Sequence, residues 1–269
     1  MDDTDPPPVA DLHVHTTASD GRLTLSEVPA AARTAGIDSV AITDHDRVHP
    51  GLDAPVRRLD GVTVVRGIEL RVDAGERGAG EVDLLGYGVR RTAALATELD
   101  RIQRNRVERG REIVARVEAH LGVDLDVEAR EGIGRPHVAR AVEASDAPYD
   151  YQDAFDDLIG DDGPCYVPRR IPSFERGVKL LSEACSVVSL AHPFRYADPD
   201  AALALTAHLD AVERYYPYER PVDPGPIDAI IEEHGLLATG GSDAHGRTLG
   251  LAGPPADAFE AFEARLPRP

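Results

Sequence analysis

The sequence is poor in cysteine and in long apolar runs, and each shortage excludes a class of protein. Its two cysteines, Cys165 and Cys185, are too few for a disulfide framework and lack metal-site spacing, so we expect two reduced thiols. No apolar stretch reaches the ~20 residues that a membrane-spanning helix requires. The acidic, proline-rich residues 1–8 have the pattern of neither a signal peptide nor a transit peptide. We therefore expect a short disordered lead and a cytoplasmic protein that contacts no membrane.

Positive charge is also scarce. The chain has 29 Lys and Arg against 48 Asp and Glu, a net charge of −19, and Lys179 is its single lysine. This balance resembles that of halophilic proteins, although a GC-rich genome would also replace lysine by arginine. Because duplex binding depends on neutralising many phosphates, we expect no binding to duplex DNA. A small phosphorylated substrate is compatible with the charge, since bound divalent metals would supply the largest local charges in a pocket.

Short apolar runs alternate with helical patterns over much of the 269 residues. A first helix is expected to begin after Thr24, with Glu27 completing a capping box, and to end near Gly36. Seven strands with interspersed helices favour an α/β fold of the βα-barrel type over an open sheet. The pattern predicts these strands at residues 9–15, 39–43, 62–70, 81–89, 187–192, 210–215 and 236–240.

The middle of the chain breaks this alternation. Apolar side chains recur at helical spacing over residues 93–120, and shorter helices are predicted at 135–143 and 151–159. Between residues 93 and 186 the only strand pattern is a brief one at 165–167. We expect residues 98–170 to form a helical insertion, with residues 1–97 and 171–269 forming the barrel. The arginines of the long helix are expected on a solvated face rather than in a nucleic-acid-binding stripe: Arg101, Arg104, Arg106, Arg109 and Arg111.

Histidines and carboxylates stand at the ends of the apolar runs. A strand places His13 and His15 on one face, because side chains alternate along it. Taken singly, such a histidine could bond a loop and such an aspartate could cap a helix. Functional groups of a βα barrel gather at the C-terminal strand ends, so we expect convergence on one rim. Imidazole and carboxylate without thiolate suit manganese, iron(II) or zinc. The other candidates are Asp20, His45, Glu69, His192, Asp243 and His245, with Asp83 inside a strand.

The motifs DLHVHTTASDG, AITDHD, GIEL, LAHP and GGSDAH resemble the ordered motifs of the PHP (polymerase and histidinol phosphatase) family. The resemblance spans almost the whole chain and implies a distorted (β/α)7 barrel with a trinuclear metal site. It assigns the first metal to His13, His15, Glu69 and Asp243, the second to Glu69 and His192, and the third to Asp20, His45 and His245. Asp11 and Asp44 are then expected to orient the histidines.

Asp83 departs from the family pattern. It stands in EVDLLGYG, where members with this type of strand usually carry histidine. A carboxylate also binds metals, and it favours manganese. We therefore expect Asp83 to be a ligand of the second metal, the alternative being a weak or empty second site.

The insertion resembles that of PHP phosphoesterases whose helical insertion caps the barrel mouth. The similar segments are GRPHVAR, residues 134–140, and PCYVPR, residues 164–169. The resemblance implies that Arg135 and His137 contact a substrate phosphate, a role that suits the planar fork of arginine. The alternative is a proline in the first turn of an ordinary helix. His49, His120, His208 and His234 have no motif context and are expected to be structural or surface residues.

These expectations combine into a metal-dependent phosphoric ester hydrolase with up to three divalent metals, manganese foremost and zinc or iron as alternatives. A hydroxide bridging two metals would attack phosphorus, so no side chain is expected to be the nucleophile. The resemblance implies the 3′-phosphate of nucleoside 3′,5′-bisphosphates, or short 5′-phosphorylated oligoribonucleotides, as substrate. One alternative is a histidinol-phosphate phosphatase, against which the insertion argues. The other is a non-catalytic PHP module serving a partner protein, which would be poor in metal.

Overall fold

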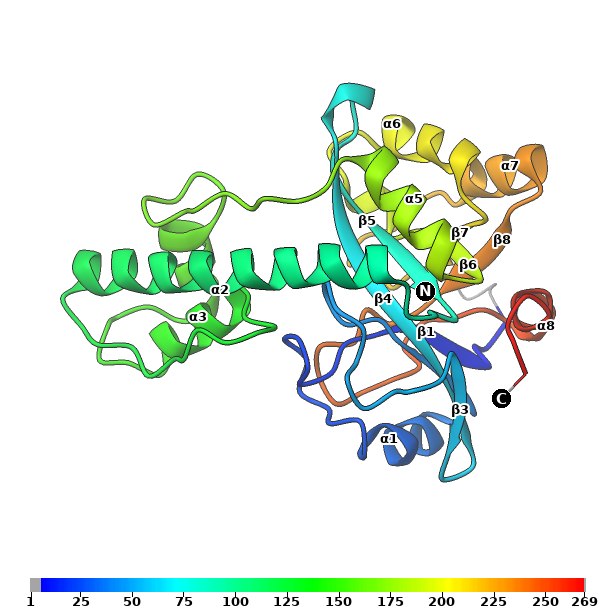
Figure 1. Cartoon of the computed structure of the whole chain (residues 1–269), viewed down its shortest axis with the longest axis horizontal. Helices are drawn as coiled ribbons and strands as arrows, with labels where there is room; N and C mark the ends of the chain where they lie inside the picture. Colours follow the sequence, from blue (N-terminus) through cyan, green and yellow to red (C-terminus); the bar gives the residue numbers. More distant parts are fainter. Residues whose placement is uncertain (1–5, 269) are drawn as a thin grey trace. The chain divides into compact units, whose positions relative to one another are not determined.

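The computed structural model of the chain describes residues 6–268. Of the expected disordered lead, residues 1–5 lie outside the described residues, and residues 6–8 have no regular secondary structure. The chain divides into two compact units (Figure 1). Thr97–Arg170 form one, here called the helical unit, and the segments before and after it form the other, the sheet unit. Among residues 6–268, no helix is both long and apolar enough to cross a membrane.

The sheet unit is built on one curled mixed sheet, which forms a half-barrel (Figure 1). Its order is β1-β2-β4-β5-β6-β7-β8, with β3 paired to β4. The pairs at both ends are parallel, whereas β4–β5 and β5–β6 are antiparallel. A bridge between Val14 and Ala244 brings the segment after β8 back to β1. The strands are β1 (Ala10–Val14), β2 (Ser39–Ile42), β3 (Val56–Leu59), β4 (Val62–Ala74), β5 (Gly80–Tyr87), β6 (Val187–Leu190), β7 (Ala211–Tyr215) and β8 (Leu237–Gly240).

All seven predicted strands are present, and the α/β class is confirmed. β3 was not predicted, because its sequence Val-Arg-Arg-Leu carries no alternation. The regular strand–helix rhythm also fails between β4 and β5, which are joined by the 3-10 turn Gly75–Arg77 instead of a helix. A hairpin makes these two strands antiparallel and sets Arg71 directly opposite Asp83. The brief strand pattern at 165–167, which is not among the seven predicted strands, forms no strand.

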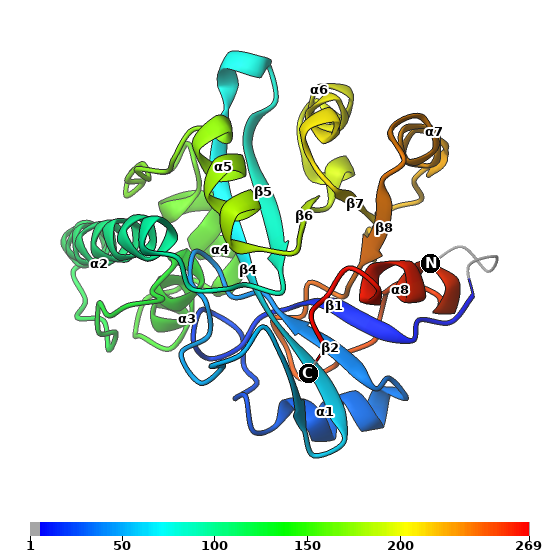
Figure 2. The ribbon, with the colours of Figure 1, turned by 45° about the vertical axis from the view of Figure 1, so that its right-hand side comes forward.

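Helices cover the sheet and close its core. α1 (Val28–Ala35) packs on β1, β2 and β4 and ends at Gly36, whose positive φ of 74° a glycine adopts without strain. Glu27 accepts the Thr24 N–H (2.8 Å), as the predicted capping box requires, but residues 24–27 form a separate turn and the helix begins later than predicted. Pro29 has no N–H to donate to the carbonyl of Leu25, so the helix does not extend back to Thr24. Figure 2 shows α5, α6 and α7 along one part of the curled sheet. The remaining bounds are α5 (Phe174–Ala184), α6 (Pro199–Ala204), α7 (Gly225–His234) and α8 (Ala256–Glu263).

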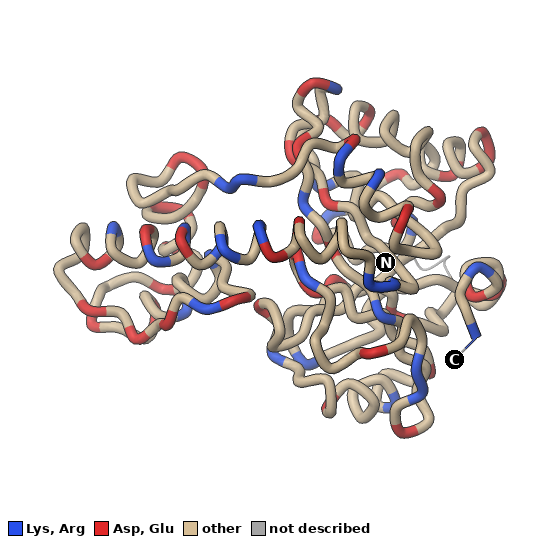
Figure 3. Tube along the Cα trace, viewed as in Figure 1, with Lys and Arg blue, Asp and Glu red and all other residues tan. Residues whose placement is uncertain are grey.

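The helical unit has its own apolar core, in which Ile113, Val117, Val138 and Leu158 are buried. α2 (Ala93–Leu121) and α3 (Arg135–Glu143) match the predicted helices closely. The helix predicted at 151–159 is a short α4 (Tyr151–Asp153) that continues as a π-helix. Figure 3 shows arginines and carboxylates interspersed along α2.

The expectation of a fully solvated arginine face on α2 was wrong for two residues. Arg106 and Arg109 are only 8% and 7% exposed. Each donates to a backbone carbonyl, Arg106 to Ile133 (2.9 Å) and Arg109 to Val167 (2.6 Å). The irregular segments of this unit leave carbonyl groups without strand or helix partners, and long arginine side chains satisfy them.

Candidate metal centre

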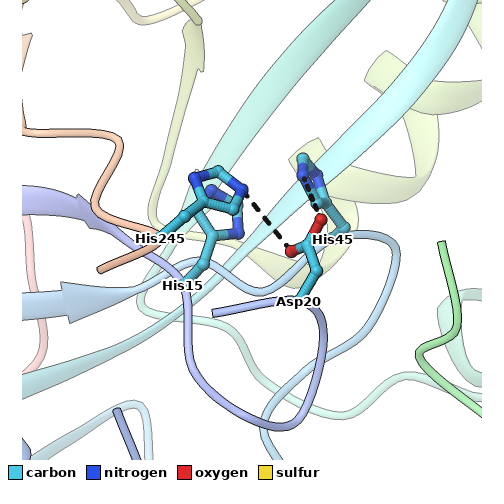
Figure 4. A group of neighbouring side chains, drawn as sticks. All are labelled: His15, Asp20, His45 and His245. Atoms are coloured by element: carbon cyan, nitrogen blue, oxygen red, sulfur yellow. Dashed lines mark ion pairs between the residues drawn. The ribbon is translucent and has the colours of Figure 1, made fainter. Parts of the chain in front are cut away.

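Nine imidazole and carboxylate side chains of the sheet unit gather in three groups, and within each group the candidate ligand atoms lie within 4.8 Å of one another. Figure 4 shows the group that mixes three imidazoles with Asp20. His45 and His245 lie 3.7 and 3.5 Å from the two Asp20 oxygens. The groups are His15, Asp20, His45 and His245; His13, His15 and Asp243; and Glu69, Asp83 and His192.

Glu69 of β4 lies at the middle of this arrangement. Its Oε1 is 3.3 Å from His13 Nε2 and 3.2 Å from His192 Nε2. Its Oε2 is 3.4 Å from His15 Nε2 and 2.6 Å from His45 Nδ1. One carboxylate therefore faces imidazoles from the ends of three different strands. The same-face placement expected for His13 and His15 brings both rings to it, with centroids 5.1 Å apart.

Two buried imidazole nitrogens at the centre have no hydrogen-bond partner among the described residues. His13 Nε2 and His15 Nε2 are buried and make no hydrogen bond with any described residue, although carboxylate oxygens lie 3.1–3.5 Å away. A buried polar atom without a partner costs free energy. A divalent cation placed among these nitrogens and oxygens would satisfy both sides. The donor set therefore fits a metal such as manganese, iron(II) or zinc.

The electrostatics of the centre couple these groups tightly. Burial disfavours a charged His13, but the carboxylates of Glu213, Asp243 and Glu69 outweigh burial and hold the pKa of His13 well above its usual range. Burial, reinforced by His245 and His45, lowers the pKa of His15 to about 4. Burial alone would raise the pKa of Glu69, yet the nearby imidazoles hold it well below its usual range. Glu69 is thus held ionised, the form that binds metals.

The backbone at the centre is unusual. His192 has φ 28° and Asp243 has φ 48°, a region that residues with a Cβ rarely adopt. Such conformations persist where the surrounding structure requires them, and they cluster at functional sites. Gly241 approaches β1 so closely that a Cβ on it would lie 2.3 Å from the His13 backbone nitrogen. Glycine at 241 therefore lets the segment that carries Asp243 reach His13.

Asp11 and Asp44 hold loops rather than imidazole rings, which corrects the expected orienting role. Asp11 accepts from the Ser242 N–H (2.9 Å), the Ser242 hydroxyl (2.6 Å) and the Gly250 N–H (2.9 Å). Asp44 accepts from the Thr16 N–H (2.8 Å) and the Ser19 hydroxyl (2.6 Å). These carboxylates fix the segments that carry the candidate ligands Asp20 and Asp243.

The residue that orients a ring is Glu213 of β7, which sequence reasoning missed. Its Oε1 accepts from His13 Nδ1 (3.0 Å) and its Oε2 from the His192 backbone N–H (2.7 Å). A donated Nδ1–H makes Nε2 the nitrogen that would bind a metal, and Nε2 would give up its own proton when it does so. The sequence did contain a signal for this role. Glu213 lies in the middle of the predicted strand at 210–215, whose other residues are mostly apolar, and a carboxylate buried in such a strand needs a polar partner.

We expect Glu213→Gln to weaken metal binding about 10- to 100-fold. The amide cannot accept at both positions, so either the His13 tautomer or the His192 N–H loses its partner. The measurement is metal affinity by competition with a chromophoric chelator, together with kcat/KM. The control is Ser189→Ala, which removes a buried hydrogen bond (2.9 Å) between Ser189 of β6 and Thr239 of β8. Equal metal affinity in Glu213→Gln and the parent would exclude an orienting role.

Asp83 reaches the centre but is already paired. Arg71 Nε donates to Asp83 Oδ1 (2.8 Å) and its Nη2 donates to Oδ2 (2.5 Å). Asp83 Oδ2 also lies 3.8 Å from His192 Nε2. Burial would raise the pKa of Asp83, but the Arg71 guanidinium outweighs it and lowers that pKa. Sequence reasoning missed Arg71, whose role depends on the β4–β5 register.

Arg135 and His137 lie in the helical unit, at the start of α3. Arg135 donates to Asp161 (2.7 Å) and to the Ile159 carbonyl (3.2 Å), and its guanidinium lies 5.8 Å from the ring centroids of Phe155 and Tyr166. His137 Nδ1 accepts from the Gly134 N–H (3.2 Å) at the helix start.

Both cysteines are free, as the sequence predicts. Burial raises the pKa of the Cys185 thiol to about 12, which makes it unreactive.

Three curated relatives match most of the chain. A 3′,5′-nucleoside bisphosphate phosphatase of Chromobacterium violaceum is 32% identical, over 96% of this chain and 98% of the relative. A phosphoribosyl 1,2-cyclic phosphate 1,2-diphosphodiesterase of Eggerthella lenta is 30% identical, over 89% and 95%. A 5′-3′ exoribonuclease of Escherichia coli is 28% identical, over 91% and 88%.

The fold is also found among solved structures. A protein from Bifidobacterium adolescentis, described as a metal-dependent phosphoesterase, superposes with a TM-score of 0.80 at 24% identity. The alignment covers 98% of this chain and 99% of that one. The PHP domain family matches residues 11–160, which include the candidate ligands from His13 to Asp83. The chain therefore belongs to the PHP domain family.

Proposed function

We propose that this chain is a metal-dependent phosphoesterase acting on nucleotides. Its substrates are nucleoside 3′,5′-bisphosphates, from which it removes the 3′-phosphate, or short 5′-phosphorylated oligoribonucleotides. The observation that carries the proposal is the gathering of nine imidazole and carboxylate side chains in three groups, with Glu69 close to imidazoles of all three. The similarity to relatives named as a nucleoside bisphosphate phosphatase and a 5′-3′ exoribonuclease supports this substrate class.

The ligand assignment follows the three groups of side chains. Divalent metals would supply charge neutralisation and an activated water for attack on phosphorus. Glu69 would be shared between sites, as its position between imidazoles from three strand ends suggests. We assign up to three metals, manganese foremost, to His13, His15, Asp20, His45, Glu69, Asp83, His192, Asp243 and His245.

Arg195 is placed to bind substrate beside the ligands. Its Nη1 donates to Asp243 Oδ2 (2.9 Å) and to the Tyr216 hydroxyl (3.0 Å), and its side chain is 54% exposed. Its other N–H groups can therefore be offered to a phosphate oxygen. Sequence reasoning missed Arg195, because nothing local distinguishes it from the other arginines.

The helical unit offers a second place for phosphate. Burial and the neighbouring charges of Arg169 and Arg135 lower the pKa of Arg109 to about 10. Several guanidinium groups held close together in this way repel one another, and an anion relieves that repulsion. We assign a terminal 5′-phosphate to Arg135, with His137 beside it. With this role the helical unit would take part in substrate binding.

For the second metal we propose that Asp83 shares its carboxylate between Arg71 and the ion, since each oxygen has a further lone pair. Asp83→Ala should then lower the metal content by about one ion per chain. Asp83→His restores the ligand type usual in the family, so it should recover that metal and shift the preference toward zinc or iron. Arg71→Gln is the control, which removes the ion pair and leaves the carboxylate.

Elemental analysis and anomalous diffraction measure the metal content in these variants. A full metal complement in Asp83→Ala would mean that Asp83 serves Arg71 alone. Loss of metal in Arg71→Gln but not in Asp83→Ala would mean that the Arg71 guanidinium, and not the Asp83 carboxylate, supports metal binding.

The test of function is turnover of a matched substrate set by the manganese-loaded enzyme. The set contains a nucleoside 3′,5′-bisphosphate, a 5′-phosphorylated trinucleotide, a phosphoribosyl 1,2-cyclic phosphate and histidinol phosphate. We expect the two nucleotide substrates to give the highest kcat/KM. Preference for histidinol phosphate or for the cyclic phosphate would overturn the substrate class. A metal-poor chain with no turnover would instead identify a non-catalytic module.

A further inference from the structure

A cavity of about 320 Å³ opens in the sheet unit after β7, and the proposed metal ligands do not line it. One wall is the segment of residues 216–224, which has no helix or strand. Prolines at 217, 221 and 224 restrict the backbone of this segment. The cavity is therefore largely preformed, as small-molecule sites usually are.

Aromatic rings line part of the cavity. The centroids of the Tyr216 and Tyr218 rings are 4.7 Å apart, and those of Tyr218 and Phe194 are 5.6 Å apart. The Tyr218 hydroxyl accepts from the Phe194 N–H (3.2 Å), which fixes the orientation of the tyrosine. Ile227 and Leu251 add aliphatic surface. Leu251, at 53%, is the one large hydrophobic side chain exposed among residues 6–268.

Tyr216 joins this cavity to the proposed metal centre. Its hydroxyl donates to Asp243 Oδ2 (3.0 Å), and its ring centroid lies 5.4 Å from that of His192. The same side chain lines the cavity. A ligand whose phosphate lies at the proposed metals would therefore find an aromatic cavity on the other side of Tyr216.

We propose that this cavity is a nucleobase site, in which the base of the substrate stacks on Tyr218 between Phe194 and Leu251. This proposal rests on the proposed function, and it adds the location at which the enzyme would bind the base of its substrate. Stacking on aromatic side chains accepts any base, because every base has a π-face. The volume lies at the lower end of the range for small-molecule pockets, as a single base requires.

The first experiment measures binding without catalysis. Adenosine is titrated into the full chain without metals, with saturation-transfer NMR and tyrosine fluorescence as readouts, the latter undisturbed because the chain has no tryptophan. Tyr218→Ala should weaken adenosine binding roughly five- to hundredfold, the usual effect of removing one stacked ring. Tyr218→Phe keeps the ring and should bind nearly as the parent. Leu251→Asp alters an exposed position, leaves folding intact and should also weaken binding. Tyr149→Ala, in the helical unit, is the control.

The second experiment compares two substrates in the manganese-loaded enzyme. One is a nucleoside 3′,5′-bisphosphate, and the other is the corresponding ribose bisphosphate without a base. Tyr218→Ala should lower kcat/KM on the first and leave it nearly unchanged on the second. Adenosine binding that depends on Tyr218 without any phosphoesterase turnover would sustain the base site and reject the proposed function. Turnover with equal kcat/KM on both substrates, unaffected by Tyr218→Ala, would overturn the base site and leave the function standing.

Discussion

Glu69→Gln is expected to abolish metal-dependent turnover, with kcat lowered at least ~100-fold. The amide keeps the size of the side chain but removes the negative charge that faces four imidazoles. Because His13, His15, His45 and His192 all lie within 3.4 Å of this carboxylate, its loss affects every proposed metal position at once. Elemental analysis should show lower metal content in parallel with the lower rate.

Glu260→Gln on the exposed surface of α8 is the matched control and should leave both quantities unchanged. Removal of metal from the parent with a chelator should reproduce the loss of activity, and added manganese should restore it. Full turnover by metal-free parent enzyme would reject metal dependence altogether.

Arg135→Ala is expected to lower kcat/KM about ten- to a hundredfold on substrates with a 5′-phosphate and much less on a simple aryl phosphate. Loss of a charge-assisted contact costs roughly 1.5–3 kcal/mol, which corresponds to that range. The measurement compares both substrates in the same preparations, with Arg111→Ala, an exposed arginine of α2, as control.

The ion pair of Arg135 with Asp161 provides a second comparison. Asp161 is 77% exposed, so Asp161→Asn removes the partner without disturbing the core. If Arg135 binds phosphate, Asp161→Asn should leave the preference for a 5′-phosphate intact. Equal losses on both substrates in Arg135→Ala, matched by Asp161→Asn, would make the arginine structural.

The features that follow local pattern could be predicted from the sequence. Strand positions followed from apolar runs, and the placement of His13 beside His15 followed from alternation alone. The features that depend on pairing could not. Arg71 meets Asp83 only because a hairpin replaces the expected helix, and Glu213 reaches His13 across a separation of 200 residues. Arg106 and Arg109 appeared solvated because helical spacing does not reveal which carbonyl groups of a neighbouring irregular segment lack donors.

The seam between β1 and the segment after β8 has a consequence for how the protein matures. Val14 bridges Ala244, and His13 Nε2 lies 3.5 Å from Asp243 Oδ1, so side chains far apart in the sequence would share one proposed ion. Closing so long a loop carries an entropic cost before any of these contacts form. The proposed metal centre can be completed only after the segment that carries Asp243 and His245 has been synthesised and has paired with β1. Metals bound at the proposed site would link the two sides of this seam, and they would stabilise the closed sheet in proportion to the logarithm of their free concentration.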